Sequence, residues 1–178
     1  IQKYLAARGA KVNVLGSTDS AAQVQLLNTA VAQHPDLIFL EALDSKAVAP
    51  AIAKAKAQGV TILNTDGPAD SAVASGLHQV LSDNYSLGRF AAMNLVEGLT
   101  QEHKKTANIA VIEGTAAMLV TQDRMRGFND VLKKYPQFKV VSVQDCNWDP
   151  VLSGRIATQL FAKYGKHGLQ GMYGMADY

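Results

Sequence analysis

Short apolar runs alternate along the whole chain with longer segments in which apolar residues recur every three or four positions. The short runs are rich in Val, Ile and Leu and predict buried strands, whereas the longer segments predict amphipathic helices. Strands separated by helices of this length favour parallel pairing with right-handed crossovers, so the predicted fold class is α/β. The predicted strands are Lys11–Leu15, Leu37–Leu40, Val60–Leu63, Gly76–Leu81, Asn108–Ile112, Phe138–Val143 and Leu169–Tyr173.

The helical segments begin at residues that commonly start helices. Ser20 and Ser45 are predicted N-caps, and Asp149, which precedes a proline, predicts a further helix start. Pro50 fits the second of these helices only if that helix begins near Val48. The apolar positions expected to face the core are Val24, Leu27 and Val31; Val48, Ile52 and Ala55; Leu87, Phe90, Ala91 and Leu95; Val120, Phe128, Val131 and Leu132; and Ile156, Leu160 and Phe161.

Polar residues recur directly after the apolar runs. They are Asn64, Thr65 and Asp66; Glu113, Gly114 and Thr115; Gln144, Asp145 and Trp148; and Asp177. In an open parallel sheet, ligands bind beyond the carboxyl ends of the strands, so these residues are expected to converge on one crevice. This pattern favours a polar small-molecule site over a purely structural surface.

Composition narrows the class of protein. The chain has 178 residues, of which 48% are hydrophobic and 18% charged, as in ordinary globular domains. Its net charge of +2 comes from scattered basic residues, which indicates solvated helix ends and argues against direct nucleic-acid binding. No stretch is apolar for long enough to predict a membrane span. Cys146 is the single cysteine, so no internal disulfide is expected, and a packed thiol is favoured over a nucleophile.

Catalytic motifs are missing from the sequence. It contains no glycine-rich dinucleotide motif, no phosphate-binding loop and no Gly-x-Ser-x-Gly elbow. His34, His78, His103 and His167 lie far apart and form no metal-binding motif. We therefore expect neither a cofactor nor a metal, and we treat an enzyme as a minority interpretation.

Several motifs occur in an order that is typical of one family. They are Asn64-Thr65-Asp66-Gly67, Leu81-Ser82-Asp83-Asn84 with Leu87-Gly88, Arg124-Met125-Arg126-Gly127-Phe128, and Trp148. Each motif is weak alone, but together they resemble the type I periplasmic binding proteins, most closely the ribose- and galactose-binding branch. That branch shares its fold with the effector domains of lactose-repressor-like regulators. The similarity covers essentially the whole chain.

The resemblance implies two Rossmann-like lobes, each a parallel sheet flanked by helices, that enclose a ligand between them. Residues 1–82 would belong to the N-terminal lobe and residues 83–178 to the C-terminal lobe, with Ser82, Asp83 and Asn84 at the hinge. Against the family pattern the chain lacks the first strand and the last strands. We therefore expect a partial sequence that is incomplete at both ends.

The same resemblance assigns the ligand-binding residues. Asp66 matches an aspartate that accepts sugar hydroxyls, Arg124 matches an arginine that reaches the sugar from the second lobe, and Trp148 falls where an aromatic ring stacks on the sugar. Asn64 and Asp177 complete the predicted site. The chemistry fits a sugar, because charged groups bind hydroxyls strongly and an aromatic ring covers the apolar C–H face.

Two departures from the family pattern leave the ligand open. Gly67 stands where many sugar binders have arginine, and Ala176 stands where many have asparagine. Both changes remove hydrogen-bonding groups that distinguish one sugar from another. A pentose, a furanose, a polyol or a small signalling molecule would each be compatible.

The resemblance implies a solute receptor that delivers a sugar to the permease of an ATP-driven importer. Such a receptor works in the periplasm or another extracytoplasmic compartment, free or lipid-anchored, and is made with a signal peptide that this sequence lacks. An effector domain of a sugar-responsive repressor or sensor would share the same features. An enzyme that uses Asp66 and Asp177 is the third alternative, and it would have to turn over a bound sugar.

Overall fold

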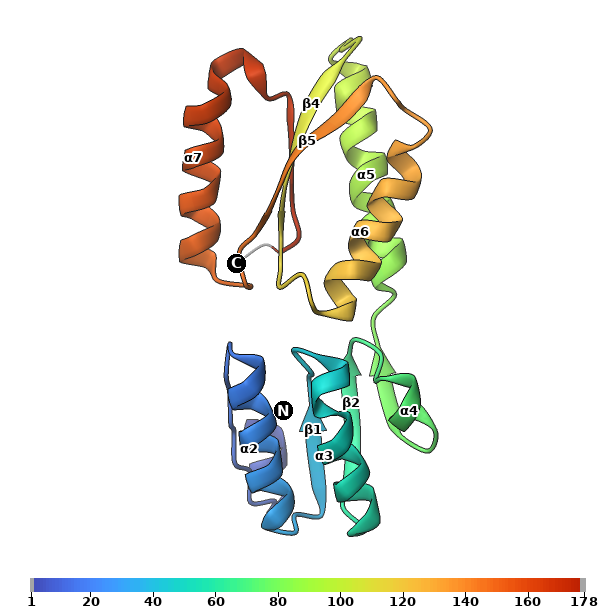
Figure 1. Ribbon diagram of the computed structural model, residues 1–178, viewed down its shortest axis with the longest axis vertical. Helices are drawn as coiled ribbons and strands as arrows, with labels where there is room; N and C mark the ends of the chain where they lie inside the picture. The colour runs from blue at the N-terminus through green and yellow to red at the C-terminus, as the bar shows by residue number, and fades with distance from the viewer. Residues whose placement is uncertain (1, 177–178) are drawn as a thin grey trace.

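The computed structural model describes residues 2–176 and contains two parallel three-stranded sheets, ordered β1-β2-β3 and β5-β4-β6. Helices flank both sheets, so the predicted α/β class is confirmed (Figure 1). We call the first sheet with α2, α3 and α4 the N-terminal lobe, and the second with α5, α6 and α7 the C-terminal lobe. The elements are α1 Gln2–Ala6, α2 Ser20–Ala32, β1 Leu37–Leu40, α3 Ser45–Ala57, β2 Thr61–Asp66, α4 Ser71–Ala74, β3 His78–Leu81, α5 Asn84–Gln101, β4 Ala107–Glu113, α6 Leu119–Leu132, β5 Phe138–Asp145, α7 Pro150–Gly168 and β6 Gly171–Gly174.

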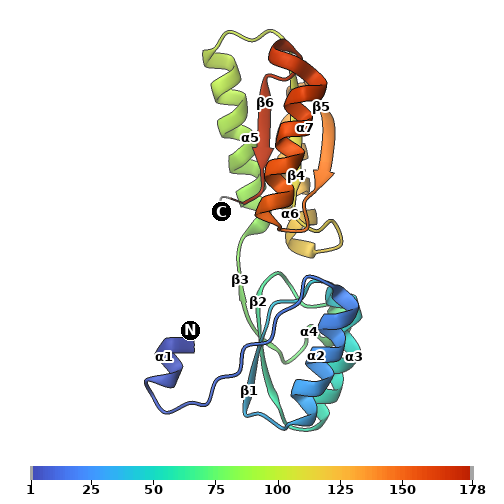
Figure 2. The ribbon, with the colours of Figure 1, turned by 90° about the vertical axis from the view of Figure 1, so that its left-hand side faces the viewer.

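The core of the N-terminal lobe lies between its sheet and the helices α2 and α3, which cover the same face (Figure 2). Val31 from α2 and Val48 and Ile52 from α3 are almost fully buried there, against Ile62 of β2. These helix positions were predicted from their spacing to face the core, and the burial of their side chains confirms it. On the other face, Phe39 of β1 remains exposed.

The caps of α2 and α3 differ from those predicted. The Asp19 carboxylate accepts the Ala22 N–H at 2.7 Å, and Asp44 caps α3 in the same way. A carboxylate one residue earlier reaches the free amides of the first turn, so Ser20 and Ser45 become the first helical residues instead. Pro50 was expected to require a helix start near Val48, but α3 begins at Ser45 and contains this proline.

Residues 11–15 do not form the predicted strand. Val14 is 67% exposed, and none of the described strands pairs with this segment. A strand is stable only when its backbone groups find a ladder partner, which an apolar run alone does not guarantee. Figure 2 shows α1 standing apart from the sheet. The short helix α4, capped by Asp70, was not predicted.

The C-terminal lobe has β4 at its centre and a core on each face of the sheet. Helices α5 and α6 cover one face, where Phe128 and Ile109 are fully buried, and α7 covers the other, where Ile156 and Leu160 are buried (Figure 1). Cys146 is buried on the α7 side, as a packed thiol would be.

Helices α5 and α6 touch through their backbones. A methyl group added at Gly88 would overlap the Arg124 carbonyl, and one added at Gly127 would overlap the Tyr85 carbonyl. Small residues are required where two helices approach this closely. This crossing fixes α6, which carries Arg124, against α5, which continues from the link between the lobes.

The close crossing also explains errors in the predicted apolar face of α5. Leu87 and Phe90 were expected to be buried but are 47% and 59% exposed. The face that packs in the lobe instead carries Gly88, Ala92 and Val96, because small side chains let α6 approach. On α7, Phe161 was likewise expected inside and is exposed.

Candidate ligand-binding site

The carboxyl ends of both sheets point toward the space where the two lobes meet (Figure 1). The lobes touch there. A methyl group added at Gly67, just after β2, would lie 2.8 Å from the Cγ1 of Val120 on α6. Val120 therefore occupies the space that a longer side chain at position 67 would need. The site is framed by these strand ends and by the start of α6.

Asp66 is the last residue of β2 and adopts a left-handed backbone conformation, with φ of 64°. Its carbonyl oxygen accepts the Ser82 N–H at 3.1 Å and the Asn84 side-chain amide at 3.4 Å. Non-glycine residues seldom adopt this conformation unless their surroundings hold them in it, and such positions cluster at functional sites. The segment that links the lobes thus fixes the backbone of the principal candidate residue in the N-terminal lobe.

Asn64 is placed differently from the other candidates. It is 1% exposed, and its Nδ2 donates to the Gly67 carbonyl at 2.6 Å and to the Gln79 Oε1 at 3.3 Å. The amide is therefore engaged inside the lobe, where it closes the turn that follows β2. This placement favours a role in shaping the turn, not direct contact with a ligand.

Arg124 lies on α6 and is half-buried. Its Nε donates to the Asn84 Oδ1 at 2.8 Å, and its Nη1 donates to the Met175 carbonyl at 2.9 Å. A guanidinium carries further N–H donors, which remain for other acceptors. The centre of the group is 5.4 Å from the centroid of the Trp148 ring. The structure therefore brings two predicted ligand residues, Arg124 and Trp148, together.

Trp148 is held from several sides in the turn between β5 and α7. Its indole Nε1 donates to the Met118 sulfur at 2.9 Å, and its ring lies so close to Gly114 that a methyl group there would overlap it. Asn147 and Trp148 both have positive φ angles, of 50° and 57°. The ring position is thus set by the turn and by the strand end of β4.

The predicted hinge residues connect the two lobes. The chain runs from the end of β3 at Leu81 into α5 at Asn84, and Asp83 caps that helix by accepting the Ser86 N–H at 3.0 Å. This hydrogen bond holds the pKa of Asp83 below its usual range. Asn84 is 2% exposed and joins Asp66 to Arg124. Asp177, the remaining candidate, lies outside the described residues.

Similarity to known proteins agrees with this geometry. A family model for the periplasmic binding protein domain matches residues 1–178. The chain belongs to this family. The resemblance inferred from the motifs is therefore confirmed.

Curated relatives of this periplasmic binding protein domain are sugar binders by name. The ribose import binding protein of Bacillus subtilis is 29% identical over 150 residues, which cover 84% of this chain and 47% of that protein. The D-ribose/D-allose-binding protein of Pseudomonas aeruginosa is 26% identical over 151 residues, covering 83% of this chain and 46% of that protein. The chain thus spans about half the length of the curated relatives it matches.

A solved structure supports the same fold. The crystal structure of a galactofuranose binding protein superposes with a TM-score of 0.87 at 20% sequence identity, over 99% of this chain and 60% of that one. At this identity the likeness establishes the arrangement of elements alone. It agrees with the two-sheet architecture described above.

Carboxylates gather at the strand ends of this periplasmic binding protein domain. Burial raises the pKa of Glu113 at the end of β4, and the charge of Asp145 adds to the effect. Glu41 follows β1 and was not singled out from the sequence. Burial of its carboxyl group raises its pKa, and the negative charge of Asp66 adds to the effect. The Asp145 carboxylate accepts the N–H groups of Ala116 and Asn147, so it holds the turns that follow β4 and β5.

Replacing Glu113 with glutamine is expected to raise thermal stability at neutral pH. The folded protein raises the pKa of Glu113 above 4.5, its value in the unfolded chain. In the pH window between these two pKa values, the folded protein binds a proton that the unfolded chain has lost. Stability therefore falls as pH rises through that window, and the glutamine removes this loss. Melting temperatures measured from mildly acidic to neutral pH test this. The exposed Glu97→Gln should not reproduce the change, and equal curves for both variants would contradict it.

Replacing Gly114 with alanine is expected to displace the Trp148 ring, because the new methyl group would overlap it. The chain contains a single tryptophan, so intrinsic fluorescence reports on this ring alone. We expect a red-shifted emission maximum as the indole becomes more solvated. Gly154→Ala, where nothing lies within 4 Å, is the control. An unchanged spectrum for Gly114→Ala would show that the ring is not fixed by this contact.

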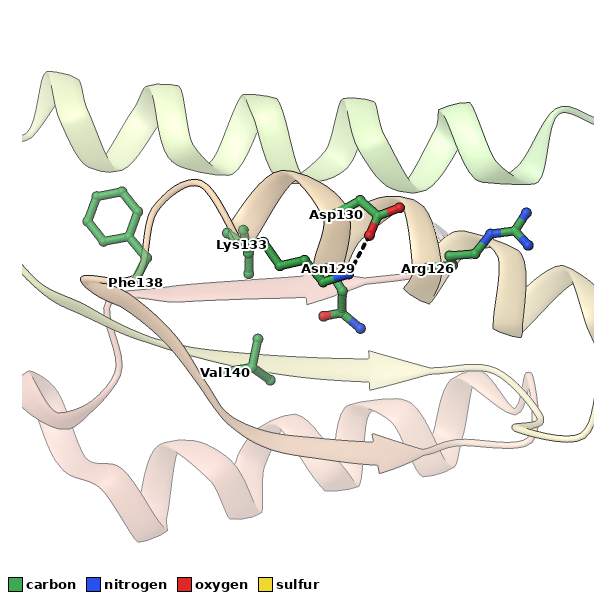
Figure 3. A pocket seen from close by; sticks show the side chains of 7 residues that line it. Arg126, Asn129, Asp130, Lys133, Phe138 and Val140 are labelled. Atoms are coloured by element: carbon green, nitrogen blue, oxygen red, sulfur yellow. Dashed lines mark hydrogen bonds and ion pairs between the residues drawn. The ribbon is translucent and has the colours of Figure 1, made fainter.

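A surface hollow of about 490 Å³ lies outside this site, between α6 and β5 (Figure 3). Charged side chains line it, and the ion pair between Lys133 and Asp130 spans 2.7 Å. It contains none of the predicted ligand residues.

Within residues 2–176, no cluster of His, Cys, Asp or Glu is arranged to hold a metal, and no helix is long and apolar enough to cross a membrane.

Proposed function

We propose that the protein is a solute receptor that binds a sugar or polyol between its lobes and delivers it to the permease of an ATP-driven importer. The observation that carries the proposal is the placement of Asp66, Arg124 and Trp148 where the lobes meet, linked through the hinge. Relatives named for ribose, allose, apiose and xylitol support this ligand class. We take residues 1–82 and 83–178 as the parts belonging to the two lobes.

Each lobe supplies a different part of the recognition. The Asp66 carboxylate of the N-terminal lobe accepts hydrogen bonds from ligand hydroxyls, and the free N–H groups of Arg124 in the C-terminal lobe donate to ligand oxygens. The exposed part of Trp148 covers an apolar C–H face. A ligand held by both lobes favours their closed arrangement, because only that arrangement makes all contacts at once.

The ligand leaves the receptor chemically unchanged in this proposal. The site has carboxylates for hydrogen bonding, but it needs no acid and base pair, because transport requires capture and release alone. The importer recognises the closed form in an extracytoplasmic compartment. A receptor that is lipid-anchored and one that is free would work in the same way.

Calorimetry against D-ribose, D-allose, D-apiose and xylitol tests the proposal. We expect at least one of these to bind, and Asp66→Gly to weaken that binding by at least about 10-fold. Glycine removes the carboxylate and accepts the left-handed backbone, so it adds no strain. Asp36→Ala, an exposed carboxylate that precedes β1, is the control. Binding that survives Asp66→Gly unchanged would show that the site is wrongly assigned.

A further inference from the structure

Asn84 is a buried amide whose two ends contact different lobes. Its Oδ1 accepts the Arg124 Nε–H at 2.8 Å, and its Nδ2 lies 3.4 Å from the Asp66 carbonyl and 3.3 Å from the Ser82 carbonyl. Only 2% of the residue is exposed. A buried amide with its acceptor and donor both engaged has little freedom to rotate.

The contact with Arg124 restricts a side chain that is otherwise flexible. The long chain of an arginine has many rotamers, and ordering one of them during binding reduces affinity. In this structure the guanidinium is already held by Asn84 and by the Met175 carbonyl. Its remaining N–H groups are thus aimed before a ligand arrives.

The contact with Asp66 acts on the backbone. Asp66 has a positive φ, and its carbonyl receives both the Ser82 N–H and the Asn84 amide. If the Asn84 donor were lost, the Asp66 carbonyl would still accept the Ser82 N–H at 3.1 Å, which keeps the turn in place. The same amide contacts one candidate residue in each lobe.

We propose that Asn84 is a positioning residue that fixes the Arg124 guanidinium and couples it to the Asp66 turn across the hinge. It need not touch the ligand. Its effect on binding is exerted through Arg124, and that part rests on the function proposed above. Asp83 differs, because its side chain caps the same helix by accepting the Ser86 N–H.

Nuclear magnetic resonance tests the contact without any ligand. The Arg124 Nε–H signal, assigned by its loss in Arg124→Lys, should exchange with water more slowly than that of Arg126, whose side chain is 62% exposed. Asn84→Ala should abolish this protection, whereas Asn84→Asp, which keeps an acceptor, should retain it. Fast exchange in the unchanged protein, or protection that survives Asn84→Ala, would overturn the contact.

A double-mutant cycle tests the coupling to binding, with whichever of D-ribose, D-allose, D-apiose and xylitol binds best as the probe. Asn84→Ala should weaken binding by at least about 10-fold in the unchanged protein and by less than about 2-fold when Arg124 is already alanine. Asn129→Ala, at an exposed position of α6, should leave affinity within about 2-fold. Equal losses in both backgrounds would overturn the positioning role. If no probe binds the unchanged protein, the proposed function fails, and the resonance measurement still decides the contact.

Discussion

Gly127→Ala is expected to lower the free energy of unfolding by about 3 kcal/mol or more. The added methyl group would overlap the Tyr85 carbonyl and approach the Arg89 amide, which are backbone atoms of α5. A backbone cannot move aside as a flexible side chain can, so the helices must separate. Urea unfolding followed by circular dichroism measures the loss.

Gly98→Ala is the matched control for this change. It lies in the same helix pair, on α5, and a methyl group there meets nothing within 4 Å. Alanine is the better helix former, so this variant should be as stable as the unchanged protein or more stable by up to about 1 kcal/mol. If both glycines gave equal stability changes, close backbone packing would not be what holds α5 and α6 together.

Arg124→Ala is expected to reduce affinity for the best-binding probe sugar by about 100-fold. The change removes the charged donors of the C-terminal lobe and leaves the Asn84 Oδ1 and the Met175 carbonyl without their partner. Charge-assisted hydrogen bonds to hydroxyls are among the strongest that a neutral sugar can form. Titration calorimetry gives the ratio of dissociation constants.

Arg126→Ala is the control for charge on the same helix. This arginine is exposed and pairs with Asp123 at 3.0 Å on the surface of α6. Exposed pairs of this kind contribute little to stability, so both stability and affinity should stay nearly unchanged. A comparable loss of affinity in the two variants would indicate a general electrostatic attraction in place of a specific contact.

Local sequence patterns were sufficient to predict most of the fold. Each β-strand that formed overlaps a predicted one, and Asp149 with its following proline marked the start of α7. Buried helix positions such as Val48 and Phe128 followed the expected periodicity. These features depend on residues close together in the chain, which a sequence displays directly.

Features that depend on distant partners were predicted poorly. Residues 11–15 have the composition of a strand but no ladder partner, and Phe90 has the spacing of a core residue but faces away from α6. The contact between Asn84 and Arg124 joins positions 40 residues apart, and no local pattern reveals it. For the site, the motifs indicated which residues to consider, while the geometry separated the engaged Asn64 from the others.

The turn that carries Trp148 holds two successive residues in a strained backbone conformation. An aromatic residue in the left-handed region costs roughly 1–2 kcal/mol, and Asn147 beside it adds to that cost. The carboxylates of Asp145 and Asp149 accept backbone N–H groups on either side and hold the turn in place. The folding free energy that this strain costs is no longer available to offset destabilising substitutions elsewhere. The C-terminal lobe should therefore tolerate fewer random mutations than it would if the backbone at position 148 were unstrained.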